Sequence, residues 1–421
     1  MPLCKHKVGY LERSIVALIF GGAMSKELKN IKESIPTPED LYQKARDLQP
    51  ILRARAAKAA ELRYVPSETI QDFKDLGFFK IVQAKSWGGY EMNPMVFYKV
   101  TGLIAEACMS SAWAFSVVAV HNWQISVFDQ QAQQDVWGND PSVLISSSYA
   151  PKGMVTEVEG GYQVTGEWDW SSGSDHCDWF FGGAILDFSK GLESFVTLLI
   201  PRSDYKIIDN WHTYGLKGTG SKKIKVEDAF VPHHRIHYLK DAFECKNPGN
   251  EMNDAALFKL PFGQIFTHSV AIPALGAYQG ALNEFIEGAK SRVSSFGVEA
   301  KTNPKTLSLA AESQTEIDLM WNTIESNINA MMACAEANQP IDVADRTRYR
   351  YQVSTVNDKC VNGALKLVKA SGGATVYLGH EVTNKFLDIM MTQVHVANIA
   401  DPFAADLGMS MLGQPAVNLM S

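Results

Sequence analysis

Aromatic and hydroxyl side chains gather at one turn of the sequence, in the stretch EWDWSSGSDHCDW (167–179). The residues before this turn alternate as a β-strand does, so Trp170, Ser171 and Ser172 stand where a strand is predicted to end. A flat apolar ring beside hydroxyl and backbone donors fits a ring system that has polar atoms along one edge, such as an isoalloxazine. The alternative is a turn rich in serine and glycine whose tryptophans belong to the core.

A second hydroxyl cluster lies upstream, in ISSSYAPKG (145–153), and offers Ser147 and Ser148. The two serine clusters frame the start of the same β-rich region. Because both clusters frame one region, they are less well explained as two unrelated serine-rich turns. The arrangement favours one ligand site to which both clusters contribute.

Two isolated histidines are candidates for acid–base chemistry. His121 ends a long apolar helical segment, eight residues after Trp113 and therefore on roughly the same side of the helix. His395 stands in MMTQVHVAN, again among apolar residues. An imidazole can donate, accept or transfer a proton near neutral pH. The alternative for each is a hydrogen-bonded histidine of the core.

Two further signals concern phosphate binding. Arg292 in AKSRVSSFG closes a helical segment, where its guanidinium could bind a diphosphate through two hydrogen bonds. The glycines of ASGGATVYLG (370–379) would let the backbone at Gly373 and Ala374 approach a ligand closely. A solvated helix end and a plain helix C-cap are the alternatives.

The elements that must position these residues fall into three blocks. Residues 37–140 are predicted to be helical, residues 141–250 to form short antiparallel strands of a barrel or sandwich, and residues 251–421 to form long helices of an antiparallel bundle. The fold class is therefore α+β and mostly α. Residues 1–36 are expected to be an N-terminal extension. Their apolar run loosely resembles an export signal, but a polar helical segment begins at Met24, which favours an extension or a structured arm.

Composition narrows the class of function. The formal net charge is −7, with 39 basic and 46 acidic residues, and an even mixture of this kind argues against a nucleic-acid partner. The six cysteines show no metal-site spacing and are predicted to be reduced thiols of a cytoplasmic protein. No segment approaches the length of a membrane span. No strand is followed by GxGxxG, so no pyridine-nucleotide site is expected.

The layout and several motifs together resemble the acyl-CoA dehydrogenase fold, from about residue 40 to the C-terminus. GYQVTGEWDW, GLKGTGSKKIKVEDAFVP, SRVSSFG and SGGAT carry this resemblance. It implies an N-terminal helical domain, a middle β-barrel and a C-terminal four-helix bundle. Within that fold, ISSSYAPKG, WSSGSDH, IPRSDYKIIDNWHTYGLKGTGS and the run from Ser110 to Pro141 resemble the oxygenase components of two-component flavin-dependent aromatic hydroxylases. Those that act on steroid-derived phenols and on 4-hydroxyphenylacetate are the most similar.

This resemblance implies a role for each candidate residue. His121 and Ser147 would face the phenol, with His121 as its base, while Ser172 would lie near flavin N5 and His395 near the peroxide of a C4a-hydroperoxyflavin. Phosphate would be held across a subunit interface by Arg292, Gly373 and Ala374. The full set of implied flavin contacts is Trp113, Ser147, Ser148, Trp170, Ser171, Ser172, Arg292, Gly373, Ala374, His395 and Val396.

The same resemblance implies the reactants and partners. Reduced flavin, FADH₂ or FMNH₂, would be a co-substrate delivered by a separate NAD(P)H:flavin reductase. The other reactants would be O₂ and a phenolic small molecule, and the chain would assemble as a homotetramer with no metal.

The sequence departs from the family pattern in two places. Leu387-Asp388-Ile389-Met390 stands where relatives carry Arg-Asp-Ala-His, and Gly263 stands where the 4-hydroxyphenylacetate enzymes have an arginine. Two other functions stay open. An acyl-CoA dehydrogenase would need a C-terminal glutamate base, although none follows Glu381. A non-catalytic flavin-binding protein is the third possibility.

Overall fold

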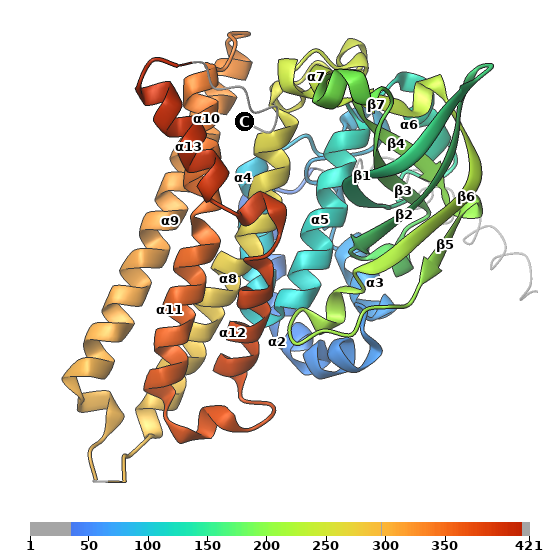
Figure 1. Ribbon diagram of the computed structural model, residues 1–421. Coiled ribbons are helices and arrows are strands. Elements are labelled where there is room, and N and C mark those ends of the chain that lie inside the picture. Colours follow the sequence, from blue (N-terminus) through green and yellow to red (C-terminus); the bar gives the residue numbers. More distant parts are fainter. Residues whose placement is uncertain (1–34, 296, 415–421) are drawn as a thin grey trace, which may run out of the picture. The chain divides into compact units, whose positions relative to one another are not determined.

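The computed structural model describes residues 35–295 and 297–414 (Figure 1). Within the described residues, one compact unit begins at Leu41, and residues 35–40 belong to a separate unit. The expected extension, including the polar helical segment expected to begin at Met24, lies outside the described residues apart from residues 35 and 36. Thr37 caps helix α2 (Pro38–Leu62), because its hydroxyl accepts from the Asp40 amide at 3.2 Å while the Asp40 carboxylate accepts from the Thr37 amide at 2.9 Å.

Helices come first in the described chain. After α2 they are α3 (Ser67–Asp75), α4 (Pro94–Ala107), α5 (Met109–Ile125) and α6 (Gln130–Trp137). Every residue of α5 is buried, as its all-round apolar sequence predicts. The position of α5 between the other helices and the sheet makes it the rigid support for any side chain it carries (Figure 1).

A sheet follows, and the described strands run in the order β5-β6-β2-β1-β3-β4-β7. Their bounds are β1 (Ile145–Val158), β2 (Gly161–Ser171), β3 (Trp179–Ile185), β4 (Phe195–Pro201), β5 (Tyr205–Ile208), β6 (Lys222–Pro232) and β7 (Ile236–Tyr238).

The described strands pair antiparallel as expected, except for one pair. β1 and β3 pair in parallel, because the turn after β2 carries the chain past β1 to its other side instead of forming a second hairpin. The strand order also leaves β5 and β7 as edges, so hydrogen bonds among the described strands do not close a barrel.

Long helices return after the sheet and surround α8 (Phe262–Ser291). The others are α7 (Leu239–Glu244), α9 (Pro304–Glu336), α10 (Val343–Ser354), α11 (Val356–Ser371), α12 (Glu381–Thr392) and α13 (Asp401–Met411). α8 packs against α4 and α5 and also against α9, α11 and α12 (Figure 1). It therefore connects the C-terminal helices to the helix that carries Trp113 and His121. No helix in the described part of the chain is long and apolar enough to cross a membrane.

Candidate active site

The turn after β2 is distorted where the sequence concentrates its aromatic and hydroxyl groups. The pairing of β2 with β6 slips between Trp168 and Ser171, and Trp170 within this bulge has φ of +67°. A bulky residue with positive φ is strained, and such strain gathers at functional sites. The Trp170 side chain is 64% exposed. Trp168, in contrast, is fully buried and donates to the Gly183 carbonyl at 3.0 Å, so it is a core residue.

A chain of hydrogen bonds fixes the serine that follows. The indole of Trp113 on α5 donates to Ser172 Oγ at 3.0 Å. Ser172 Oγ lies 2.7 Å from Ser221 Oγ, and Ser221 Oγ lies 2.7 Å from Thr219 Oγ1. Sequence reasoning did not single out Ser221 and Thr219 as site residues, although the motif GLKGTGS that contains them carried part of the family resemblance.

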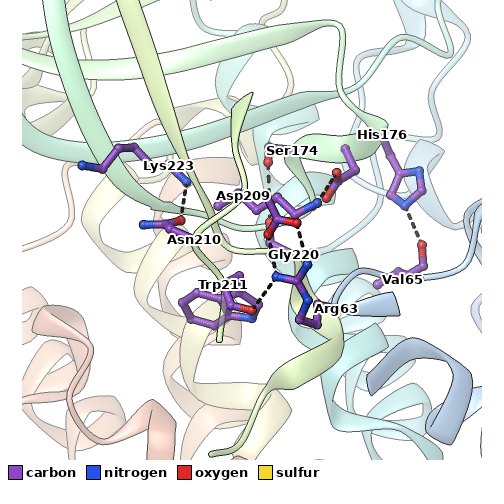
Figure 2. A network of polar contacts seen from close by, with 12 residues as sticks. Arg63, Val65, Ser174, His176, Asp209, Asn210, Trp211, Gly220 and Lys223 are labelled. Carbon is purple, nitrogen blue, oxygen red and sulfur yellow. Dashed lines mark hydrogen bonds and ion pairs between the residues drawn. The ribbon is translucent and has the colours of Figure 1, made fainter. Parts of the chain in front are cut away.

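Charged residues behind this turn hold it in place (Figure 2). Asp175 forms an ion pair with the buried Lys222 at 2.7 Å, and the His176 ring bonds to the Val65 carbonyl at 2.6 Å. Nearby, Arg63 binds both oxygens of Asp209 at 2.6 Å. Asp175 and His176 are therefore structural residues that connect the turn to the first residue of β6 and to the segment after α2.

His121 is a neutral hydrogen-bond acceptor. It is fully buried, and its Nδ1 lies 2.6 Å from the Ile145 carbonyl oxygen. A carbonyl can only accept, so Nδ1 carries the proton and Nε2 presents a lone pair. Burial lowers the His121 pKa to about 4, which keeps the ring neutral at pH 7. Among the described residues, Nε2 has no partner.

His395 has the opposite tautomer. It precedes the short 3₁₀ helix η12 (Val396–Asn398), and its Nδ1 accepts from the Ala397 amide at 3.2 Å. Nδ1 is therefore unprotonated, and in the neutral ring the proton is on Nε2. Burial, with a further contribution from Arg350, lowers the His395 pKa to about 4. His395 thus offers a donor where His121 offers an acceptor.

Aromatic rings bring the two histidines and the serine turn together. The ring of His395 packs edge-on against Trp113 with centroids 5.7 Å apart. Tyr149 lies 6.3 Å from the His121 ring and 5.0 Å from the Phe266 ring, and Phe266 lies 6.3 Å from the His395 ring. The expected grouping of Trp113, Ser172, His121 and His395 is thus present in one chain.

Ser147 of β1 lies on the same side of the strand as His121. Ser147 pairs with Phe181 across β1 and β3, and the Phe181 ring packs edge-on to His121 at 5.5 Å. Tyr149, two residues further along β1, donates from its hydroxyl to Gln124 at 2.5 Å. Ser148, between Ser147 and Tyr149, is buried. Sequence reasoning missed Tyr149 and Gln124, which lie beside residues that it named.

The phosphate candidates lie elsewhere in this chain. Arg292 ends α8 and follows Phe266 by 26 residues, which corresponds to about 39 Å of helix. Gly373 and Ala374 are exposed in η11 (Gly373–Val376), before α12, whereas His395 comes after α12. Val396 follows His395 directly but is 75% exposed. The structure therefore does not bring Arg292, Gly373 or Ala374 to the corner formed by Trp113, Ser172 and His395 of the same chain.

At residues 387–390, where the sequence departs from the family pattern, one polar residue is retained, to which sequence reasoning gave no role. Asp388 on α12 accepts from the Leu216 amide at 2.6 Å, and burial raises the Asp388 pKa to about 6. The carboxylate thus ties α12 to the segment that carries Thr219 and Ser221. Across the described residues, no group of three or more His, Cys, Asp or Glu is arranged to hold a metal ion.

Comparison with known proteins decides the family. The family model described as acyl-CoA dehydrogenase, C-terminal domain, matches residues 268–399. The oxygenase subunit HsaA of a flavin-dependent monooxygenase from Rhodococcus jostii (strain RHA1) is 37% identical over 376 residues, which cover 89% of this chain and 98% of the relative. The chain belongs to the oxygenase components of flavin-dependent monooxygenases.

Other relatives that are flavin-dependent hydroxylases support the same family assignment. The oxygenase component of p-hydroxyphenylacetate 3-hydroxylase from Acinetobacter baumannii is 31% identical over 89% of both chains. The crystal structure of 3-HSA hydroxylase from Rhodococcus sp. RHA1 superposes with a TM-score of 0.87 at 36% identity, covering 91% of this chain and 99% of that one. The chain is thus the oxygenase component of a two-component aromatic hydroxylase that uses reduced flavin, and its fold is acyl-CoA dehydrogenase-like.

The residues at the corner fit a flavin ring. Ser171 Oγ is buried and has no partner among the described residues, so a ligand atom would satisfy it. The Trp170 ring and the backbone of the bulge offer a flat surface and polar groups beside it. Trp113, Trp170, Ser171 and Ser172 are therefore residues of this oxygenase that would hold the isoalloxazine.

Proposed function

We propose that this oxygenase hydroxylates a phenol at the carbon next to its hydroxyl group, using O₂ and reduced flavin supplied by a separate NAD(P)H:flavin reductase. The observation that carries the proposal is the pair of histidines in opposite tautomers near one aromatic corner. His121 presents a lone pair at Nε2, and His395 presents an N–H at Nε2. Hydroxylation of a phenol is assisted by both groups, an acceptor for the phenol proton and a donor toward the flavin.

Each side chain has a distinct task in this proposal. Bound reduced flavin supplies the activated oxygen. His121 accepts the phenol proton at Nε2, which raises electron density at the neighbouring carbon. His395 donates a hydrogen bond from Nε2 on the flavin side, Ser172 is held by Trp113 to donate beside it, and the surrounding rings exclude water.

We propose that the substrate is a largely apolar phenol, steroid-derived or similar. The rings of Phe262, Phe266 and Tyr149 pack against one another beside His121. Gly263 lies between the two phenylalanines and supplies no cation for a substrate carboxylate. The name of one relative, p-hydroxyphenylacetate 3-hydroxylase, supports a phenol as the substrate class.

Reconstitution tests this function. The purified chain would be combined with an unrelated flavin reductase, NADH, FAD or FMN, ¹⁸O₂ and a panel of apolar and carboxylate-bearing phenols. We expect no NADH oxidation by the chain alone, and one ¹⁸O atom in an ortho-hydroxylated product when the reductase is present. NADH oxidation by the chain alone, or no labelled product from any phenol, would contradict the proposal.

A dehydrogenase function has less support in this structure. The carboxylate that it would require must be free to act as a base, yet Asp388, the carboxylate of α12 that faces the segment before β6, accepts from a backbone amide. Adding an acyl thioester to the reconstitution experiment tests this case, because a dehydrogenase would oxidise the thioester without consuming O₂ stoichiometrically.

We further propose that a second copy of the chain completes the flavin site, in a homotetramer. Arg292 and the Gly373–Ala374 turn lie far along α8 and α12 from the corner of their own chain. Gly373 and Ala374 are exposed and Arg292 is half-buried, which leaves them available to a neighbouring copy. Val376, Tyr377 and Leu378 beside the turn are 80%, 74% and 103% exposed.

Mixed oligomers test the shared site. Ser172→Ala and Arg292→Ala chains would each be made alone and then co-expressed with different tags. If the site spans two copies, each variant alone is impaired, but mixed oligomers regain a fraction of activity because some sites combine two intact halves. Mixed oligomers no more active than the average of the two variants would show that each chain forms its site alone.

We also propose that the protein works in the cytoplasm. The described cysteines are all free, which fits a reducing cytoplasm. A reductase that uses NAD(P)H is expected in the same compartment.

A further inference from the structure

A buried cation lies next to the turn that carries His395. Arg350 on α10 is 1% exposed, and among the described residues it forms no ion pair with a carboxylate. Its guanidinium lies 3.5 Å from the centre of the Phe403 ring on α13. A fully buried arginine without an acidic partner is costly, so its position calls for a functional explanation.

Arg350 is connected to His395 through one residue. Arg350 Nη2 donates to the Ala397 carbonyl at 2.8 Å, and the Ala397 amide donates to His395 Nδ1 at 3.2 Å. The same residue therefore receives the arginine on one side and fixes the histidine tautomer on the other. Loss of the arginine would release the carbonyl that holds η12 against α10.

The charge of Arg350 acts on His395 as well. Three elements contribute groups near this histidine: Trp113 from α5 and Phe266 from α8 are uncharged, and Arg350 comes from α10. His268 of α8, which also senses the charge of Arg350, is buried and neutral at pH 7 because its pKa is lowered to about 4. Among the described residues, Arg350 is thus the charge that opposes protonation of His395.

We propose that Arg350 is a positioning residue that keeps His395 uncharged and in its Nε2–H tautomer, by its charge and by its bond to Ala397. This inference rests on the proposed function of His395 as a donor toward the flavin. A second proton would displace the Ala397 amide from Nδ1 and turn η12. Arg350 thus extends the working range of the oxygenase toward acid pH without touching flavin or substrate.

Two variants separate charge from hydrogen bonding. Arg350→Gln retains an N–H donor for the Ala397 carbonyl but removes the charge, whereas Arg350→Lys retains the charge. Histidine-selective ¹⁵N spectra of the flavin-free chain would report the protonation midpoint of His395, with His395→Gln used to assign its signal. We expect the midpoint to rise by about one pH unit in Arg350→Gln and to stay near the wild-type value in Arg350→Lys.

The reaction supplies a second readout. With a reductase present, the pH below which H₂O₂ replaces product should move up in Arg350→Gln by the same interval as the midpoint. Arg346→Gln, one turn earlier on α10 and also buried, is the matched control and should move neither value. An unchanged His395 midpoint in Arg350→Gln overturns the inference. A shifted midpoint in a chain that hydroxylates no phenol overturns the proposed function alone.

Discussion

At the corner formed by Trp113, Ser172 and His395, the role of each side chain depends on whether its hydrogen-bond partner can donate or accept. Ser172 accepts from the Trp113 indole, and an indole N–H can only donate. The Ser172 proton is therefore free to be given to Ser221 or to a ligand. The same reasoning gives the two histidines different tautomers, because His121 bonds to a carbonyl and His395 bonds to an amide N–H. Sequence inspection could name Ser172, His121 and His395, but it could not fix their protons, because the deciding partners are backbone groups.

Substitution of Trp170 tests whether its exposed ring contributes to flavin binding. Trp170→Gly should leave the fold intact and raise its stability by up to about 1 kcal/mol, because glycine adopts φ of +67° without strain. The exposed ring contributes little packing beyond its contact with Lys152, whose Nζ lies 5.7 Å from it. Reduced-flavin affinity should fall, since the flat surface is lost.

Thermal unfolding and anaerobic flavin titration check the two halves of this prediction. Trp168→Phe is the contrasting variant, because Trp168 is a core residue and its change should lower stability. Unaltered flavin affinity in Trp170→Gly would remove Trp170 from the flavin site.

Among the elements, the segment before β6 depends on α12 for its position. Leu216 donates to Asp388, and a side chain at Gly215 would collide with the Leu387 carbonyl at 2.3 Å. This contact joins residues 172 positions apart, so local sequence patterns gave no sign of it. The same limit explains the parallel pairing of β1 with β3, whereas helix and strand character follow from local periodicity and were predicted.

The contact between Asp388 of α12 and the segment before β6 leads to a prediction about how stability depends on pH. Its pKa is raised by burial to about 6, so the native state binds more protons than the unfolded state between roughly pH 4 and pH 6, and stability is lost as pH rises through that window. Asp388→Asn keeps an oxygen for the Leu216 amide and removes the charge. Its stability relative to wild type should therefore grow by about 2 kcal/mol from pH 4 to pH 7.

Urea unfolding of both proteins at several pH values measures this difference. Asp388→Ala, which also loses the hydrogen bond, should be destabilised throughout. A difference between Asp388→Asn and wild type that does not change with pH would show that the carboxylate titrates normally.

For the whole molecule, buried histidines set the response to acid. Burial lowers the pKa of His121, His237 and His268 to about 4 each. In the unfolded chain they bind protons from about pH 6.5 downward. Stability should therefore fall as pH drops from 7 to 4, by about 2 kcal/mol for each histidine at pH 5.

His237 isolates this effect, because it lies outside the candidate site. His237→Gln retains a donor for Asn247 Oδ1, which the ring nitrogen contacts at 3.0 Å, but does not titrate. The difference in unfolding free energy between wild type and this variant should change by about 2 kcal/mol between pH 7 and pH 5 in favour of the variant. A constant difference would show that His237 titrates normally in the folded protein.

The central claim is that His121 acts on the phenol and His395 on the flavin side, and comparing His121→Asn with His395→Asn tests it most directly. Asparagine at 121 can still donate to the Ile145 carbonyl but offers no lone pair in place of Nε2, so product formation should slow by about 10²–10⁴-fold and recover in part at high pH. His395→Asn should instead release more H₂O₂ per NADH at every phenol concentration, and His395→Gln, which can donate in place of Nε2–H, should retain more coupling. Product and H₂O₂ would be measured together with an unrelated reductase. The same defect in both asparagine variants, or no change in product yield in either, would contradict the account.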